Sequence, residues 1–331
     1  MTEVYPNIFM EELPLPGSPL KALNCFLIRG SARNLIVDVG FDTEAGKQAL
    51  RQALGALRFA PERTDLFLTH MHEDHIGAML SLRTEGLFTH AFISAEDGTY
   101  YNRVRQEGLR ASVTRIARLS GFSEAEAQQA YAHHPAARLT PGLPPARFTT
   151  LRDGDSLPLG GFDFTVKHFP GHTMGLLGLY EETQRLLLSG DHILSKISPN
   201  ITFWQEDFDA LGAYLQSLRK ARALCPVRVF SAHRALPQDA AARIDALLAH
   251  HDRRLEEVLH LLRRNGPGTA RDVAAEMHWD YGGGDFRRFA MNQVWFATGE
   301  ALAHLEHLFH SGRAERGTRN GAYIYSVNKI P

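Results

Sequence analysis

The sequence lacks the marks of a secreted or membrane-bound protein. Its 331 residues include only two cysteines, Cys25 and Cys225, which excludes a disulfide framework and favours a reducing compartment. Both cysteines stand among apolar residues, so we expect them to be buried. The start of the chain has no basic stretch followed by a long apolar run, and no apolar run reaches the length of about eighteen residues that a membrane span needs. We therefore expect a cytoplasmic protein with no membrane partner, although a sequence with a trimmed leader would look the same.

An excess of charge of one sign is also missing. The chain has 36 Lys and Arg against 37 Asp and Glu, a formal net charge of -1. Such a balance offers no general attraction to nucleic acid or to anionic membranes. The length and the 44% hydrophobic content support a substantial core, enough for one large domain and a small one.

What the sequence does contain is a dense cluster of histidines. The stretch T-H-M-H-E-D-H-I-G places His70, His72, Asp74 and His75 directly after the apolar run 66–68. Histidine and carboxylate together suit zinc or iron, and His70 and His72 can project to one side of a strand end while Asp74 and His75 face another. The pattern therefore indicates two adjacent metals. The alternative, a solvated polar loop, does not explain the matching residues farther along the chain.

Three more candidate ligands each follow a run that reads as a strand. His172 stands in F-P-G-H-T-M-G after the alternating run 162–166, Asp191 follows the apolar run 186–188, and His233 follows 227–230. Gly190 allows a tight turn that would deliver the Asp191 carboxylate at the strand tip. We expect five histidines and two aspartates to converge.

This series, H-x-H-x-D-H followed by G-H-T, S-G-D and a strand-terminal histidine, resembles the metallo-β-lactamase superfamily of binuclear metallohydrolases. The resemblance covers roughly residues 23–233. It implies a first metal on His70, His72 and His172, a second on Asp74, His75 and His233, and a bridge between them through Asp191. Zinc is the expected metal of both sites, and iron and manganese stay open because mixed His and Asp ligands accept all three.

Four further residues are candidates for roles other than metal binding. We expect Asp38, His168 and His192 to support ligands rather than to bind metal, and the alternatives are turn capping for Asp38 and core or surface positions for the histidines. Arg234 stands where many superfamily members carry a glycine beside the last histidine, so its role stays open.

An internal repeat predicts the fold independently. Residues 25–40 give two apolar runs around a short turn, followed by a helical stretch and the strand that leads to His70; residues 175–191 begin the same order, which ends at His233. The duplication indicates two facing sheets flanked by helices. The fold class is therefore α/β, and the family resemblance implies a four-layer αβ/βα sandwich.

The catalytic domain is expected over 1–250, with a helical insertion at about 94–145. Helical candidates in the insertion are 97–111 and 123–133, whose apolar residues could line an acyl-sized pocket or, as we favour, simply pack between helices.

A small, mostly helical, winged-helix-like domain is expected over 251–331. We predict a long helical region over 239–264 that is interrupted near the domain boundary, a helix capped by Thr269, a helix over 292–311 and a hairpin over 313–327. From residue 251 onward the chain has eleven Lys and Arg against ten Asp and Glu. A DNA-reading domain should be clearly basic, so a cap over the active site or a homodimer surface is favoured over nucleic-acid binding.

These expectations converge on a metal-dependent hydrolase. A water held between two divalent metals loses a proton near neutral pH and becomes the hydroxide nucleophile, and Asp74 is the best proton acceptor. The expected substrate is a small acyl thioester or related ester; a lactone or a phosphodiester, as in a ribonuclease, would use the same water. Iron-dependent persulfide oxidation at a single metal is disfavoured by the complete second ligand set. The alternative of another class is a metal-stabilised protein that binds nucleic acid or a partner without turnover.

Overall fold

The computed structural model describes residues 1–133, 141–280 and 284–328. The chain divides into two compact units. The first comprises Met1–Arg103, Pro144–Pro199 and Ser217–Asp245, and the second comprises Val104–Leu143, Asn200–Gln216 and Ala246–Pro331. The predicted insertion at 94–145 is thus shared between the units, with residues 134–140 outside the described part. The domain boundary near residue 250 stays a prediction.

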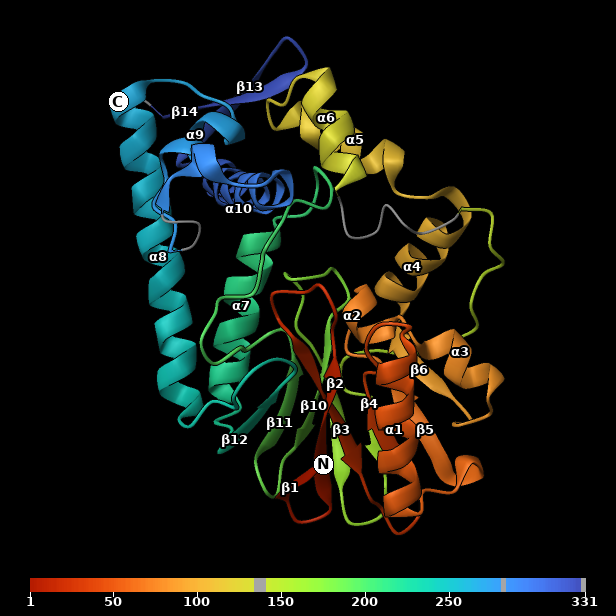
Figure 1. Cartoon of the computed structure of the whole chain (residues 1–331). Helices are drawn as coiled ribbons and strands as arrows, with labels where there is room; N and C mark the ends of the chain where they lie inside the picture. The colour runs from red at the N-terminus through yellow and green to blue at the C-terminus, as the bar shows by residue number, and fades with distance from the viewer. Residues whose placement is uncertain (134–140, 281–283, 329–331) are drawn as a thin grey trace. The chain divides into compact units, whose positions relative to one another are not determined.

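Two β-sheets form the centre of the first unit (Figure 1). The described strands of the larger sheet lie in the order β1 (Thr2–Tyr5), β2 (Ile8–Pro14), β3 (Ala22–Ile28), β4 (Asn34–Val37), β5 (Thr64–Phe67), β6 (Ala91–Ser94) and β7 (Thr149–Leu151). Those of the smaller sheet lie in the order β12 (Arg228–Ser231), β11 (Leu186–Gly190), β10 (Leu177–Glu181), β9 (Asp163–His168) and β8 (Ser156–Pro158).

Strand pairing confirms the repeat predicted from sequence. In the larger sheet β3 and β4 pair antiparallel and β4 continues parallel to β5. In the smaller sheet β10 and β11 pair antiparallel and β11 continues parallel to β12. Because the last strands of each repeat run parallel, β4 and β5 end at one edge of their sheet, and so do β11 and β12 of theirs.

Apolar side chains from both sheets fill the space between them. The buried core includes Phe26, Val37 and Phe67 from the larger sheet and Phe164 and Leu188 from the smaller one. Every residue of β5 is buried, as expected for an interior strand of a parallel run.

Helices cover the outer faces of the sheets (Figure 1). The helix α1 (Glu44–Leu57) packs on the larger sheet through Leu50, Leu54 and Leu57, which share one helical face. Its N-terminus is capped by Thr43, whose hydroxyl accepts from the Gly46 amide. This unit also contains η1 (Pro61–Arg63), α2 (Glu73–Ile76), α3 (Met79–Thr84) and the first residues of α4 (Ala95–Glu107).

On the smaller sheet, the part of α7 (Ala210–Ala223) from Ser217 onward belongs to the first unit. Lys220 there donates to the carbonyl of His168, at the end of β9. With its two sheets and flanking helices, the first unit is the mixed α/β sandwich that the sequence predicts.

The second unit is mostly helical. Its described elements include α5 (Arg110–Leu119), α6 (Glu124–Ala132), α8 (Ala240–Asn265, from Ala246), α9 (Ala270–Glu276), η4 (Phe286–Arg288), α10 (Met291–His310), β13 (Ala314–Arg319) and β14 (Ala322–Val327). Thr269 caps α9 through a capping box with Asp272, as predicted.

Two sequence-based expectations were wrong. The helix α8 is continuous over 26 residues rather than interrupted, because no glycine or proline occurs between Ala240 and Asn265. Cys225 is exposed rather than buried, because it lies in the turn after α7 with a left-handed backbone (φ 48°). Among the described residues, no helix combines the length and apolar character needed to cross a membrane.

Candidate metal centre

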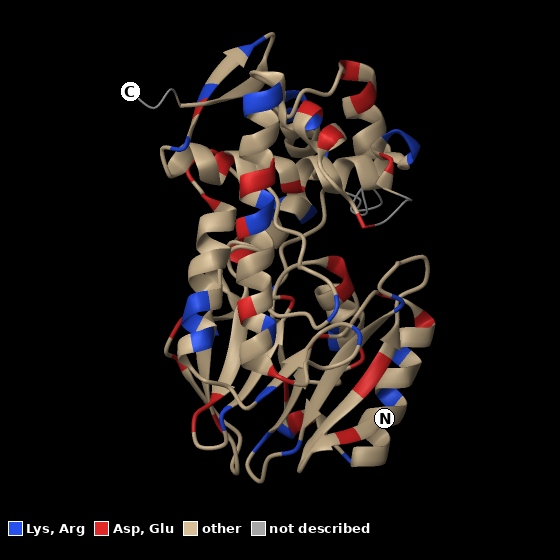
Figure 2. Ribbon diagram, turned by 90° about the vertical axis from the view of Figure 1, so that its left-hand side faces the viewer, with Lys and Arg blue, Asp and Glu red and all other residues tan. Residues whose placement is uncertain are grey.

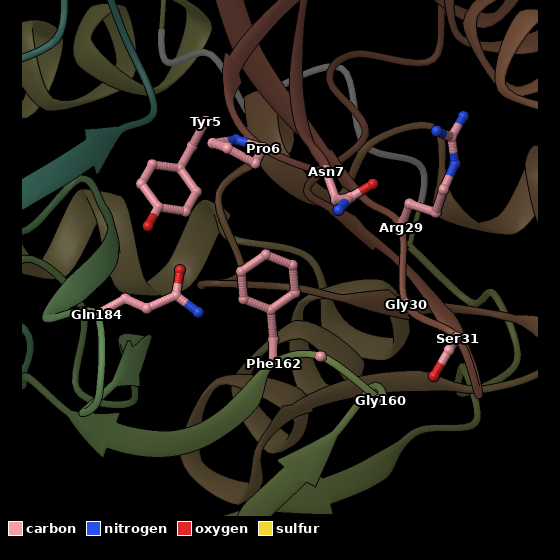
Figure 3. A pocket seen from close by; sticks show the side chains of 10 residues that line it. Tyr5, Pro6, Asn7, Arg29, Gly30, Ser31, Gly160, Phe162 and Gln184 are labelled. Atoms are coloured by element: carbon pink, nitrogen blue, oxygen red, sulfur yellow. The ribbon is translucent and has the colours of Figure 1, made fainter.

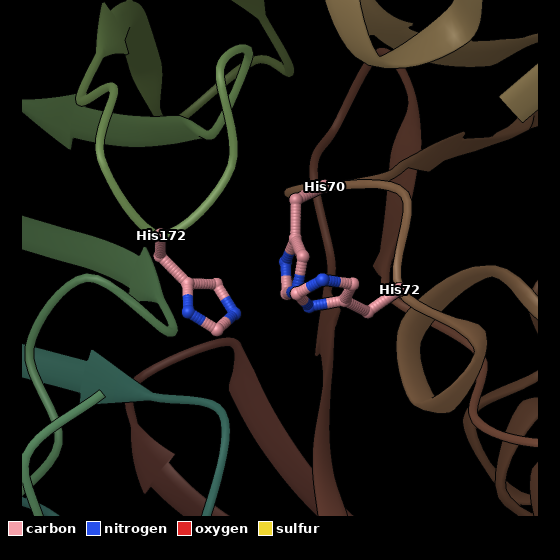
Figure 4. A group of neighbouring side chains, drawn as sticks. All are labelled: His70, His72 and His172. Carbon is pink, nitrogen blue, oxygen red and sulfur yellow. The ribbon is translucent and has the colours of Figure 1, made fainter. Parts of the chain in front are cut away.

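Three imidazoles from two loops form the first group of the centre. His70 and His72 lie in the loop between β5 and α2, and His172 lies in the loop after β9 (Figure 4). The Nε2 atom of His70 lies 3.0 Å from Nδ1 of His72, and the His172 ring centroid is 4.9 and 4.7 Å from those two rings. One nitrogen of each ring can be chosen so that all three lie within 4.8 Å of one another.

A second group lies directly beside the first. Asp74 and His75 come from α2, and His233 follows β12. The Nε2 atom of His233 lies 3.3 Å from Nε2 of His75 and 3.5 Å from a carboxylate oxygen of Asp74. Ligand atoms of these three side chains also lie within 4.8 Å of one another.

Asp191 lies between the two groups. Its Oδ1 atom is 3.6 Å from Nε2 of His75 and 3.5 Å from Nε2 of His233, and its Oδ2 atom is 3.5 Å from Nε2 of His172. All seven candidate ligands predicted from the sequence thus converge, and one carboxylate directs an oxygen to each group.

Strand ends explain this convergence. His70, Asp191 and His233 follow β5, β11 and β12 at the carboxyl ends of parallel pairs. Gly190 at the end of β11 has φ 52°, and a Cβ built on it would lie 2.8 Å from Cβ of Thr69. Glycine therefore serves two needs here, a left-handed backbone and close approach of the two sheets.

Hydrogen bonds behind the rings fix their orientation. The Nδ1 atom of His75 lies 2.8 Å from Oδ2 of Asp38, and Nδ1 of His233 lies 2.9 Å from the carbonyl oxygen of Ala22. A proton on each Nδ1 leaves the Nε2 lone pair directed into the centre, which is the tautomer that a metal ligand needs.

Sequence comparison identifies this arrangement. Residues 20–233, nearly two thirds of the chain, match the sequence model described as the metallo-beta-lactamase superfamily. The chain belongs to the metallo-beta-lactamase superfamily. Residues 255–328 match a second model, the metallo-beta-lactamase-like C-terminal domain. Whether that region is also winged-helix-like stays a prediction.

Solved and curated superfamily members resemble the chain over different lengths. A metallo-beta-lactamase family protein of Thermus thermophilus, known from a crystal structure, is 30% identical, with 98% of this chain and 100% of that chain covered and a TM-score of 0.79. The acyl-coenzyme A thioesterase MBLAC2 of Gallus gallus is 30% identical over 51% of this chain and 56% of its own length. The hydroxyacylglutathione hydrolase GloC of Haemophilus influenzae is 26% identical over 57% of this chain and 74% of its own. The match thus spans only about half of the Gallus gallus protein.

The balance of burial and nearby charges lowers the pKa of some imidazoles at this site and raises the pKa of others. Burial and the nearby His75 lower the pKa of His70 well below its ordinary value, and burial and His172 lower the pKa of His72 to about 3. Both rings are therefore neutral at pH 7, the form that binds metal. Burial also opposes a proton on His75, but the carboxylates of Asp38 and Asp191 outweigh it and raise the pKa of that ring.

The donor set fits two divalent cations. Imidazole nitrogens and carboxylate oxygens are ligands of zinc, iron and manganese. Burial favours the neutral form of Asp191, but His233 and His75 outweigh it and lower the pKa of that carboxyl, so the group stays ionised. Its buried Oδ1 atom has no hydrogen-bond partner among the described residues. Because an unsatisfied buried carboxylate oxygen is costly, a cation at this position would stabilise the cluster.

The predicted supporting residues lie in different places. Asp38, with φ 60° at the end of β4, accepts from the Thr69 amide and hydroxyl as well as meeting His75. The Nε2 atom of His168 lies 2.9 Å from the carbonyl oxygen of Met174, in the loop that carries His172. His192 is buried with its ring stacked on Phe169 at 4.6 Å.

Arg234 contacts a neighbouring segment of the chain through its backbone carbonyl. Its side chain is exposed, its φ is 62°, and its carbonyl oxygen accepts from the Asn24 side chain at 2.8 Å.

Sequence reasoning missed Asp97, a fully buried carboxylate in the first turn of α4. Its oxygens accept hydrogen bonds from Met71, Thr173 and Gly175. A signal was present, because Asp97 follows β6 closely, as His70 follows β5. Acidic residues are common in the first turn of a helix, so Asp97 alone does not indicate a site.

A separate pocket of about 440 Å³ lies at the other end of the sandwich (Figure 3). Its lining includes Tyr5 at the end of β1, and Arg29, Gly160 and Gln184 from the turns between successive strands. The turn with Gln184 precedes β11, whereas Asp191 follows it, so the pocket and the histidine cluster are separated by the length of the strands. The ionisable groups of the lining are Tyr5 and Arg29, which provide neither a metal-ligand cluster nor an activated nucleophile.

Proposed function

We propose that this chain is a binuclear metal-dependent hydrolase that cleaves carboxylic thioesters. The observation that carries the proposal is the position of Asp191, with one carboxylate oxygen near His75 and His233 and the other near His172. One carboxylate facing two groups of nitrogen ligands is suited to bridge a pair of cations. In the proposed arrangement the first cation is held by His70, His72 and His172, and the second by Asp74, His75 and His233.

When bound, two divalent cations would acidify water and polarise the carbonyl of the substrate, so the chain needs no serine or cysteine nucleophile. The part of the protein is to hold the ligands at fixed positions. The partners of His75 and His233 keep their Nε2 atoms directed inward. Their rings and that of His70 are fully buried, which excludes bulk water from one side of the centre.

Asp74 is proposed as the proton acceptor. Its side chain is 17% exposed, whereas that of Asp191 is 9% exposed, so Asp74 is the carboxylate more open to solvent. Burial favours the protonated form of Asp74, but the neighbouring His75 and His233 outweigh it and lower the pKa of the carboxyl, which keeps the group ionised. The same carboxyl can return that proton to the leaving group.

The substrate class is supported by two relatives. The Gallus gallus relative is named an acyl-coenzyme A thioesterase and the Haemophilus influenzae relative a hydroxyacylglutathione hydrolase. Coenzyme A and glutathione are both thiols, and a thiolate is a good leaving group. We therefore propose a small-molecule acyl thioester as the substrate. A substrate other than nucleic acid is supported by the charge distribution, because Lys and Arg are interspersed with Asp and Glu (Figure 2).

The test is hydrolysis by purified protein of acyl-coenzyme A and acylglutathione substrates, with lactones and bis-p-nitrophenyl phosphate in the same panel. We expect thioester turnover that stops after chelation and returns with added zinc, iron or manganese. Asp191→Asn should abolish it, and Asp163→Asn, on an exposed position of β9, is the matched control. Turnover confined to lactones or phosphodiesters would contradict the substrate class. Chelator-insensitive turnover, or none with any metal, would contradict the hydrolase.

A further inference from the structure

Asp97 is a buried carboxylate that the proposed chemistry does not use. Its side chain has no solvent exposure. Three donors satisfy its oxygens. The Met71 amide and the Thr173 hydroxyl donate to Oδ2 at 3.2 and 2.7 Å, and the Gly175 amide donates to Oδ1 at 2.8 Å. A buried acid so fully bonded needs a specific reason to be present.

The donors belong to the two loops of the first ligand group. Met71 stands between His70 and His72, and Thr173 follows His172 directly. One carboxylate therefore ties together loops that are about a hundred residues apart in sequence. Asp97 itself is held at the end of β6, where its amide donates to the Ser94 hydroxyl at 3.2 Å.

The Gly175 amide, the third donor, lies in close packing against Asp97 and Ser94. A Cβ built on Gly175 would lie 2.0 Å from Oγ of Ser94 and 2.7 Å from Oδ1 of Asp97. Any side chain at position 175 would separate the loop that carries His172 from the β6 end. Glycine at this position thus allows the second loop to close on the same carboxylate as the first.

We propose that Asp97 is the positioning residue of the first metal site, which sets the mutual geometry of His70, His72 and His172 by joining their loops. This inference rests on the proposed function, since it takes those three imidazoles to hold a cation. The second group has its own supports in Asp38 and the Ala22 carbonyl, so it does not depend on Asp97. Loss of Asp97 therefore weakens the two sites unequally.

The expected size follows from the behaviour of partners that orient metal ligands, whose loss typically costs about 10–100-fold in metal affinity. Asp97→Asn keeps the volume but replaces one acceptor oxygen with a donor that faces other donors. Thr173→Val removes a single hydrogen bond at nearly constant volume, and Thr173→Ser restores the hydroxyl. If Asp97→Asn does not fold, the variants Thr173→Val and Thr173→Ser still test the proposal.

Zinc affinity of metal-free protein, measured by competition with a chromophoric chelator, separates the sites. In a His233→Ala background, which retains the first group, Asp97→Asn and Thr173→Val should weaken binding about 10–100-fold. Thr173→Ser should bind like its parent. In a His72→Ala background, which retains the second group, the same changes should leave the affinity unchanged.

Three results with the variants would overturn the inference alone. Equal losses in both backgrounds would assign Asp97 a general structural role, and unchanged affinity in the His233→Ala background would remove its link to the site. A loss that Thr173→Ser shares with Thr173→Val would exclude the hydrogen bond as the cause. Wild-type protein that takes up no cation would contradict the proposed function and this inference together, whereas normal wild-type uptake with unaffected variants contradicts the inference alone.

Discussion

Replacing Gly190 with alanine would disturb the approach of the two sheets without changing any proposed ligand. Gly190 precedes Asp191, and Thr69 precedes His70. A Cβ on Gly190 would lie 2.8 Å from both Cβ and Oγ1 of Thr69, closer than such atoms can remain. Relief of this contact requires the end of β11 to move away from the loop after β5. The movement would separate Asp191 from the histidines that it faces.

Two costs add in this variant. A left-handed backbone (φ 52° at Gly190) costs an alanine about 1–2 kcal/mol, and forcing an extra methyl group into a packed interior costs a further ~1–3 kcal/mol. Gly154 provides a matched control, because its φ is 87° and a Cβ built there has nothing within 4 Å. Gly154→Ala carries the backbone cost alone, so Gly190→Ala should unfold more easily by about 1–3 kcal/mol.

Urea unfolding of the two variants measures this difference, and kcat/KM on the thioester that the wild type hydrolyses best measures its consequence for the site. Because a displacement of 1 Å can cost about 100-fold in rate, we expect a loss of that order for Gly190→Ala and little change for Gly154→Ala. Equal stability and equal kcat/KM for the two variants would refute the claim that close packing at Gly190 positions Asp191.

Three other predictions concern single side chains. Asp74→Asn should lower kcat about 10²–10⁴-fold in steady-state assays at an unchanged unfolding midpoint, and an unchanged kcat would remove Asp74 from proton transfer. Asp38→Asn should weaken zinc binding at the second site about 10–100-fold in chelator competition, and an unaltered affinity would leave Asp38 with a capping role only. Burial lowers the pKa of His304 in the second unit to about 3, below its unfolded value of about 6.5, so the folded state takes up fewer protons than the unfolded one. Its contribution to the free energy of unfolding is therefore full above about pH 6.5 and falls by ~1.4 kcal/mol per pH unit below that pH. In urea unfolding, His304→Gln should reduce this dependence of the unfolding free energy on pH. A pH dependence equal to that of the wild type would contradict the lowered pKa of His304.

The two sheets and the candidate ligands at their strand ends could be predicted because the sequence patterns that indicate them are local. His70, Asp191 and His233 each follow an apolar strand within a few residues, and parallel strands bring such ends to one edge. The repeated order of runs also predicted two sheets, each flanked by helices. These patterns depend on chain direction and side-chain alternation, which can be recognised in the sequence without knowledge of distant contacts.

The remaining features depend on contacts between distant segments. Asp97 looks like any acid in the first turn of a helix, and only the folded chain brings Met71 and Gly175 to it. The division of the chain into units has the same origin. Residues 104–143 and 200–216 cluster with the C-terminal residues rather than with their neighbours in sequence. In that unit the Arg271 guanidinium donates to Glu126 of α6, a contact across 145 positions.

Anomalous diffraction from crystals grown with zinc would show directly whether this protein binds two metal ions. We expect two peaks per chain about 3.5–4 Å apart, one on His70, His72 and His172 and the other on Asp74, His75 and His233, with Asp191 between them. A single peak, or peaks away from these side chains, would contradict a binuclear centre in this protein.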